Sequence, residues 1–159
     1  MLSTVEKIDV RGKKTLKLTN ALIAKISNAS PMEVQKRSHM MQNYIKSHGK
    51  SIVGPLVNHS YPEMNGDGQV QIHIELIMQL DSPLHTLDKT YEFSKQLKIE
   101  NCLFARFYEK EENIRFAYFK LNVHAFENDM KLNGESYTVY VKQNSDTLMA
   151  DIFMPLQDE

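Results

Sequence analysis

The chain has 159 residues, a formal net charge of −1 at pH 7 and 42% hydrophobic residues, which is typical of one soluble globular domain with a substantial core. This near-neutral charge gives no electrostatic basis for binding nucleic acid, and no apolar run reaches the roughly 20 residues that a membrane helix needs. The N-terminus lacks the pattern of a signal peptide, and the single cysteine, Cys102, excludes an intrachain disulfide, so we expect a cytoplasmic protein that binds neither nucleic acid nor membrane.

A strand followed by a helix is predicted first. Apolar residues alternate over residues 15–27, which indicates a strand with an irregularity near Asn20. Ser30 can accept hydrogen bonds from the free amides at a helix start, and Gly49 can adopt the left-handed conformation that ends a helix. The helix is therefore expected over 31–48.

Two further strands should follow this helix. The first is expected over 52–60, and a segment rich in turn residues over 62–68 is typical of a hairpin loop. Residues 70–80 alternate more clearly than any other part of the chain, so their odd-numbered and even-numbered side chains should lie on opposite faces of a strand. Residues 81–97 are then expected to link the two halves of the chain, partly as a helix.

The second half predicts the same order of elements. An alternating run indicates a strand over 99–109, and apolar residues at helical spacing indicate a helix over 113–130. Gly134 lies near the expected exit of this helix. Two final strands are predicted over 136–142 and 147–154, with a polar turn between them.

These elements predict an internal repeat. The order strand, helix, strand, strand occurs over 14–80 and again over 98–156, with Gly49 and Gly134 as matched helix exits. A unit this short does not close a hydrophobic core alone, so the two modules should pack as a pseudo-symmetric pair. A cleft between two such halves is a common place for a small molecule to bind.

Four short motifs carry a resemblance to a known family. They are an Asn-Gly pair at 133–134, Tyr-Thr-Val-Tyr at 137–140, Asp-Ile-Phe-Met-Pro-Leu at 151–156 and Gly-Pro-Leu-Val-Asn-His-Ser-Tyr at 54–61. In this order the motifs resemble the GyrI-like family, which contains the effector-binding domains of bacterial multidrug-responsive transcription activators and their stand-alone relatives. The resemblance covers nearly the whole chain. The N-terminal segment is short, so the chain is similar to a stand-alone member.

The resemblance implies an α+β fold. Two pseudo-symmetric strand-helix-strand-strand modules would form one curved antiparallel sheet, with the helices packed on one face and a ligand in the central groove. Thr138 stands where the family often has a buried glutamate, whose charge balances a cationic ligand. We therefore expect weak binding of lipophilic cations, and a gain of about 1 to 3 kcal/mol in dye affinity on Thr138→Glu if Glu75 does not already supply the charge.

The candidate ligand-binding residues are Tyr61, His73, Glu75, Thr138 and Tyr140. His73 and Glu75 share one strand face, where they could orient a ligand, act as an acid–base pair, or form a solvated polar surface. Tyr61 and Tyr140 could stack on a planar ligand or pack in the core. Thr138 and Tyr140 share a face that matches the family's groove.

Catalytic and metal-binding signatures are missing from the sequence. The six histidines show no zinc-helix spacing and are expected at the surface or at an interface, and Cys102 is expected to act as a small buried hydrophobic residue. No catalytic residue, metal or cofactor is predicted.

The predicted function is non-catalytic binding of a small organic ligand in the groove between the modules. The alternatives are an accessory protein that binds a partner in a secreted-toxin gene cluster, where similar chains occur, and a small hydrolase of strained-ring compounds. The sequence leaves the oligomeric state open.

Overall fold

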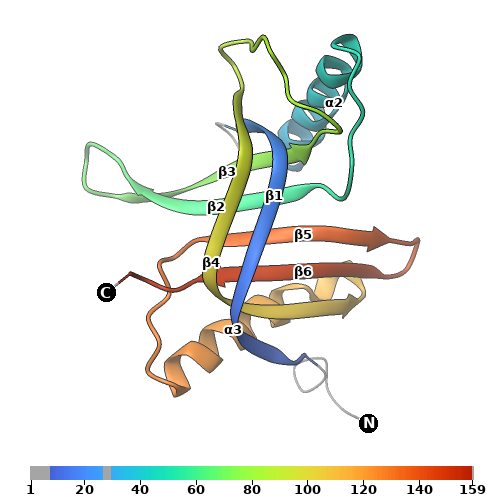
Figure 1. Ribbon diagram of the computed structural model, residues 1–159. Coiled ribbons are helices and arrows are strands. Elements are labelled where there is room, and N and C mark those ends of the chain that lie inside the picture. Colours follow the sequence, from blue (N-terminus) through green and yellow to red (C-terminus); the bar gives the residue numbers. More distant parts are fainter. Residues whose placement is uncertain (1–7, 27–29, 159) are drawn as a thin grey trace. The chain divides into compact units, whose positions relative to one another are not determined.

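The computed structural model describes residues 8–26 and 30–158. The elements in chain order are β1 (Val10–Ile26), α2 (Pro31–Ser47), β2 (Val57–Met64), β3 (Val70–Gln79), β4 (Glu92–Glu109), the 3-10 turn η1 (Glu111–Asn113), α3 (Arg115–Glu127), β5 (Ser136–Gln143) and β6 (Leu148–Pro155) (Figure 1). Helices and antiparallel strands confirm the α+β class. No helix in the described ranges is long and apolar enough to cross a membrane.

The chain divides into two compact units. The middle unit comprises Lys17–Leu97, and the terminal unit comprises Met1–Leu16 together with Lys98–Glu159. The strands β1 and β4 each continue from one unit into the other, because the boundaries at 16/17 and 97/98 lie inside them.

In the middle unit, β3 lies between β1 and β2 and pairs antiparallel with both. The helix α2 starts where Ser30 Oγ accepts a hydrogen bond from Glu33 N at 3.2 Å, as the sequence predicts. It packs on one face of these strands. The buried core residues of this unit are Leu22, Ala24, Ile26, Met41, Ile45, Leu76, Met78, Leu80 and Tyr91.

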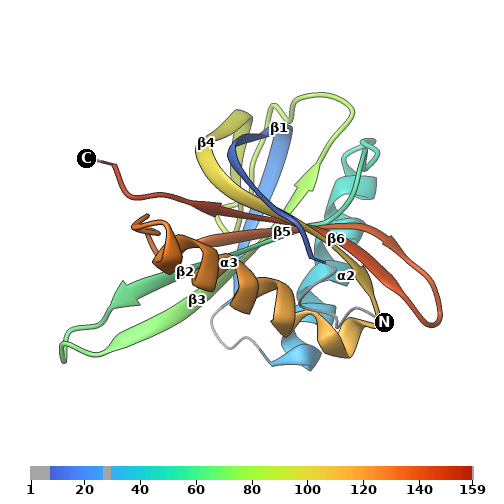
Figure 2. The ribbon, with the colours of Figure 1, turned by 90° about the horizontal axis from the view of Figure 1, so that it is seen from below.

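In the terminal unit, β6 takes the equivalent central place, between β4 and β5. The helix α3 lies along one side of these strands (Figure 2) and contributes Ala117, Leu121 and Ala125 to the core. The other buried residues of this core are Ile8, Leu103, Ala105, Phe107, Leu148, Ala150, Ile152 and Met154. Each unit therefore pairs its first strand with its third, and its second strand with its third.

Backbone hydrogen bonds correspond between the two units. Leu80 N donates to Asn20 O at 2.9 Å, and Leu156 N donates to Asn101 O at 3.2 Å. Both asparagines have positive φ, 50° and 55°, so the predicted irregularity at Asn20 recurs at the same place in the terminal unit. Three further bonds of the middle unit have a counterpart in the terminal unit. Val53 N donates to Gln79 O as Asn133 N donates to Pro155 O, and Asp81 N donates to Ser51 O as Gln157 N donates to Lys131 O. Lys50 N donates to Ile45 O as Met130 N donates to Ala125 O.

These bonds correct the predicted match between Gly49 and Gly134. Gly49 has φ 70° directly after the C-cap of α2, but α3 ends at Glu127 and is followed by Asp129 with φ 53°. Aspartate tolerates the left-handed conformation better than most residues, so this helix exit carries no glycine. Gly134, with φ 92°, corresponds instead to Gly54, with φ 80°.

Three segments differ from the prediction. The strand expected over 52–60 begins only at Val57 and continues to Met64, because Gly54 at positive φ and the proline after it interrupt the extended backbone. No helix forms over 81–97, and its last residues belong to β4. The second helix is shorter than 113–130, because η1 precedes its start at Arg115 and the positive φ of Asp129 follows its end at Glu127.

Candidate functional site

The face of the middle unit opposite α2 carries a row of polar and aromatic side chains. Because Leu76 and Met78 of β3 face the α2 core, alternation directs His73 and Glu75 to the other face. The strand register then places Tyr61 opposite His73, and His59 opposite Glu75. Three of the predicted ligand-binding residues, Tyr61 on β2 and His73 and Glu75 on β3, are therefore neighbours.

The centre of this row is a hydrogen bond between His59 Nδ1 and Glu75 Oε1, 2.8 Å long. The two side chains are only 11% and 13% exposed, so the carboxylate has little contact with water. Among the described residues, no hydrogen bond to the second oxygen, Oε2, occurs. Glu75 thus offers a poorly solvated acceptor to a donor group of a ligand.

Aromatic rings extend the row along β2 and β3. The Tyr61 ring lies 5.1 Å from the His59 ring and is stacked on the His73 ring at 5.5 Å with an interplanar angle of 25°. Burial, followed by the charge of Glu75, raises the pKa of Tyr61 above its usual value. The Tyr61 hydroxyl therefore stays protonated and remains a hydrogen-bond donor at neutral pH.

The expected pairing of His73 with Glu75 is replaced by another. His73 Nε2 lies 3.9 Å from Glu63 Oε2, and both side chains are partly exposed. His59, which the sequence placed at the surface or an interface, is 8% exposed and takes the position beside Glu75. The sequence offered no sign of this pair, because it depends on the register between two strands.

Thr138 and Tyr140 lie in the terminal unit, on the side of β5 that faces α3. Thr138 is 3% exposed and shares a hydrogen bond with the hydroxyl of Tyr118 on α3. Tyr140 packs against the core of the same unit. In the middle unit, by contrast, Tyr61, His73 and Glu75 lie on the face opposite the helix. The five predicted ligand residues thus occupy two different kinds of face.

The terminal unit has its own carboxylate at the position that corresponds to Glu75. Asp151 is paired with Arg106 in the register, as Glu75 is with Lys25. The guanidinium of Arg106 donates to both oxygens of Asp151, at 2.7 and 2.9 Å. A bidentate pair of this kind engages both oxygens of the carboxylate and balances its charge, so Glu75 is the better candidate for contact with a ligand.

Comparison with solved structures shows the fold. No protein-family model matches the sequence, and a search of curated proteins gives no match either. The EcmrR chain in a cryo-EM structure of the EcmrR–DNA complex matches with a TM-score of 0.72 and 14% identity, over 96% of this chain and 58% of that chain. The chain shares the fold of part of EcmrR. It thus spans less than two thirds of that protein's length.

Two more structures match at lower scores. A hydrolase from Listeria innocua gives a TM-score of 0.52 with 8% identity, over 95% of this chain and 92% of that chain. SAV2435 bound to tetraphenylphosphonium gives a TM-score of 0.49 with 10% identity, over 91% of this chain and 93% of that chain. At these identities the matches concern the fold alone.

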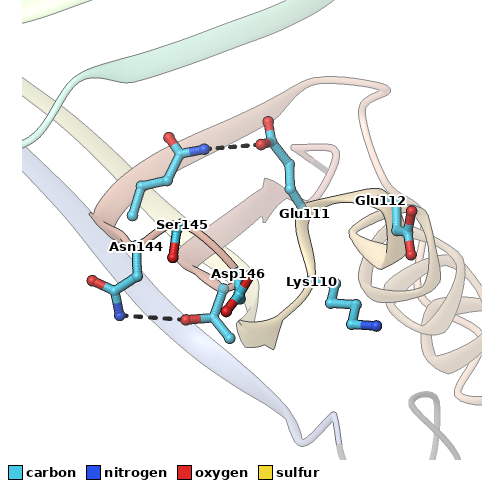
Figure 3. A pocket seen from close by; sticks show the side chains of 8 residues that line it. Lys110, Glu111, Glu112, Asn144, Ser145 and Asp146 are labelled. Atoms are coloured by element: carbon cyan, nitrogen blue, oxygen red, sulfur yellow. Dashed lines mark hydrogen bonds between the residues drawn. The ribbon is translucent and has the colours of Figure 1, made fainter.

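A small pocket of the terminal unit lies between the start of η1 and the turn that joins β5 to β6 (Figure 3). Its volume is about 300 Å³, and it is lined by Lys110, Glu111, Glu112, Gln143, Asn144, Ser145, Asp146 and Thr147. Gln143 Nε2 donates to Glu111 Oε2 at 2.9 Å across it. The lining has no aromatic or large apolar side chain, so this pocket is a poor match for an organic ligand.

The described residues provide neither a metal centre nor a reactive thiol. No group of three or more histidine, cysteine, aspartate or glutamate side chains within residues 8–26 and 30–158 could hold a metal ion. Cys102 is fully buried, as predicted, and burial raises the pKa of its thiol to about 11. The thiol is therefore protonated at neutral pH and a weak nucleophile.

Alkaline pH should destabilise the folded chain, and the two groups with the largest upward pKa shifts should contribute most. Burial raises the pKa of Tyr118 to about 12 and that of Cys102 to about 11. The unfolded chain releases both protons at lower pH, so the free energy of unfolding should fall as pH rises above about 9. By pH 11 the loss should be roughly 1 to 2 kcal/mol for Tyr118 and roughly 2 to 3 kcal/mol for Cys102, whose thiol titrates at a lower pH in the unfolded chain.

Urea unfolding at several pH values would measure this loss. Tyr118→Phe should be less sensitive to pH between pH 9 and 11 than the wild type, because it removes one of the two groups. Tyr108→Phe is the control, because Tyr108 is an exposed tyrosine, 58% accessible, and its substitution should leave the slope unchanged. Equal slopes for all three proteins would contradict the assignment.

Proposed function

We propose that this chain is a ligand-binding domain of the GyrI-like type that holds a small organic molecule without chemical turnover. The fold shared with part of EcmrR supports the proposal, as does the sequence resemblance over both halves. The corresponding hydrogen bonds of the two units support descent from one duplicated module.

The observation that carries the proposal is the environment of Glu75. Its carboxylate is 13% exposed, has one imidazole partner, and adjoins the stacked rings of Tyr61 and His73. Rings stack on planar groups, while a poorly solvated carboxylate attracts an N–H donor or a positive charge. The ligand class that fits best is a planar organic base. Tyr61, His73 and Glu75 remain the proposed contacts, and His59 is added to them.

Thr138 and Tyr140 are not proposed as contacts of the ligand. Thr138 is bonded to Tyr118, and Tyr140 packs on the terminal core. We assign both residues to the packing of α3 on its strands. A cation site at Thr138 would need a charge inside this core, so Glu75 is the carboxylate that we expect a basic ligand to meet.

Catalysis has less support than binding. A hydrolase of strained rings needs a nucleophile or an activated water beside its acid–base group, and the one cysteine is a buried, neutral thiol. His59 is held through Nδ1 by Glu75, an arrangement that also serves to keep a binding carboxylate in place. We therefore propose binding alone.

Fluorescence titration with a rhodamine-type dye tests the proposal. The wild type should bind the dye, and Glu75→Gln should weaken binding about 10-fold or more, because the amide keeps the shape of the side chain but removes the charge. Glu63→Gln is the matched control, since Glu63 is 61% exposed and lies on the neighbouring strand. Binding that is equal in all three proteins would show that Glu75 does not contact the dye.

A further inference from the structure

The outer face of α3 carries apolar side chains where a helix on a protein surface usually carries polar ones. Its inner face packs on the terminal core, where Ala117, Leu121 and Ala125 are buried. On the outer face, Phe119 is 59% exposed and Phe126 is 84% exposed. Large apolar side chains grouped in this way mark a surface that binds another protein.

These two phenylalanines belong to a longer stripe. Arg115, Phe119, Asn122 and Phe126 are the exposed positions along one line of the helix, at spacings of four, three and four residues. Asp129 follows three residues after Phe126, just beyond the helix end. We call these five residues the α3 stripe.

The charges of the α3 stripe stand at the unfavourable ends of the helix. Arg115 is its first residue, where the helix dipole favours an acidic group, and Asp129 follows its C-terminal end, where the dipole favours a basic one. Neither side chain forms an ion pair within the described part of the chain. Each charge would be balanced by the opposite end of an antiparallel copy of the same helix.

The α3 stripe is self-complementary about Asn122. Read in either direction, it runs from a charge through phenylalanine, amide and phenylalanine to the opposite charge. We propose that α3 docks antiparallel against α3 of a second copy of this chain, with a two-fold axis at Asn122. Arg115 then meets Asp129 of the second copy, and Phe119 meets Phe126, as an isologous interface requires.

Asn122 suits the position on the axis. One N–H of its amide donates to Tyr118 O at 2.8 Å within the helix. The other N–H and the carbonyl oxygen are left for a reciprocal pair of hydrogen bonds with the same residue of the second copy. A single helix pair covers less than the roughly 1,600 Å² of a standard stable interface, so the dimer should form in a concentration-dependent way.

Sedimentation velocity across a range of protein concentrations tests the docking. The wild type should shift from monomer to dimer, and Phe126→Asp should raise the dimer dissociation constant about 100-fold or more, because the two-fold axis applies the change twice. Met32→Asp is the matched control, since Met32 is an exposed helical residue on α2, 77% accessible. Circular dichroism should show that both variants fold, because neither side chain is buried.

A cross-link tests the axis itself. In an antiparallel helix pair, residues on the axis have Cα atoms roughly 5 Å apart, within the range of a disulfide. Oxidised Asn122→Cys should therefore form a covalent dimer, whereas Met32→Cys should not, and buried Cys102 should not compete. The proposal is overturned if the wild type stays monomeric at every concentration, if Phe126→Asp dimerises as the wild type does, or if Asn122→Cys does not cross-link.

Discussion

Thr138→Glu is expected to lower the free energy of unfolding by roughly 3 kcal/mol or more at pH 7. Thr138 is 3% exposed and faces α3, where its hydroxyl is bonded to Tyr118. A glutamate there would bring a charge beside the apolar side chains of the terminal core and would remove the threonine hydroxyl that pairs with Tyr118. The sequence resemblance alone predicts a gain in dye affinity, but the structure favours a loss of stability.

Urea unfolding of Thr138→Glu and Thr138→Ser would measure this effect. Serine keeps the hydroxyl and removes only a methyl group, so Thr138→Ser should cost about 1 kcal/mol. A glutamate variant that is as stable as the serine variant, and that also binds a rhodamine-type dye more tightly than the wild type, would show that position 138 opens to a ligand rather than to the core.

His59→Ala should cost about 2 to 4 kcal/mol of stability at pH 7. The substitution removes the imidazole that lies 2.8 Å from Glu75, and it leaves a carboxylate that is only 13% exposed without this partner. The change His73→Ala is the control, because His73 meets Glu63 at 3.9 Å in a partly exposed pair that should contribute less than about 1 kcal/mol.

A double-mutant cycle isolates the pair. Combining His59→Ala with Glu75→Gln should cost clearly less than the sum of the two single changes, because the second change removes the charge that the first one left unpaired. Additive costs, or a cost of His59→Ala no larger than that of His73→Ala, would mean that the His59–Glu75 contact does not stabilise the middle unit.

Local signals in the sequence predicted several elements because short-range chemistry determines them. Ser30 and Gly49 bound α2 as expected, since capping and a left-handed residue act within one helical turn. The alternation in β3 predicted a strand over 70–80 with two distinct faces. The missed exit of α3 has a local reason too, because Asp129 adopts the conformation for which a glycine was expected.

The sequence by itself thus determined the α+β class, the order of the elements and the sets of side chains that share a strand face. Only the tertiary structure decided which of those faces receives a helix, because alternation is symmetric between the two faces; this is why Thr138 lies in a core while Glu75 lies opposite one. It also decided the partner of Glu75, since the register of β2 against β3 joins His59 to a residue 16 positions away. The exposure of Phe119 and Phe126 on α3 appeared only there, because apolar residues outside the predicted buried stripe of the helix do not say by themselves which of them face the solvent.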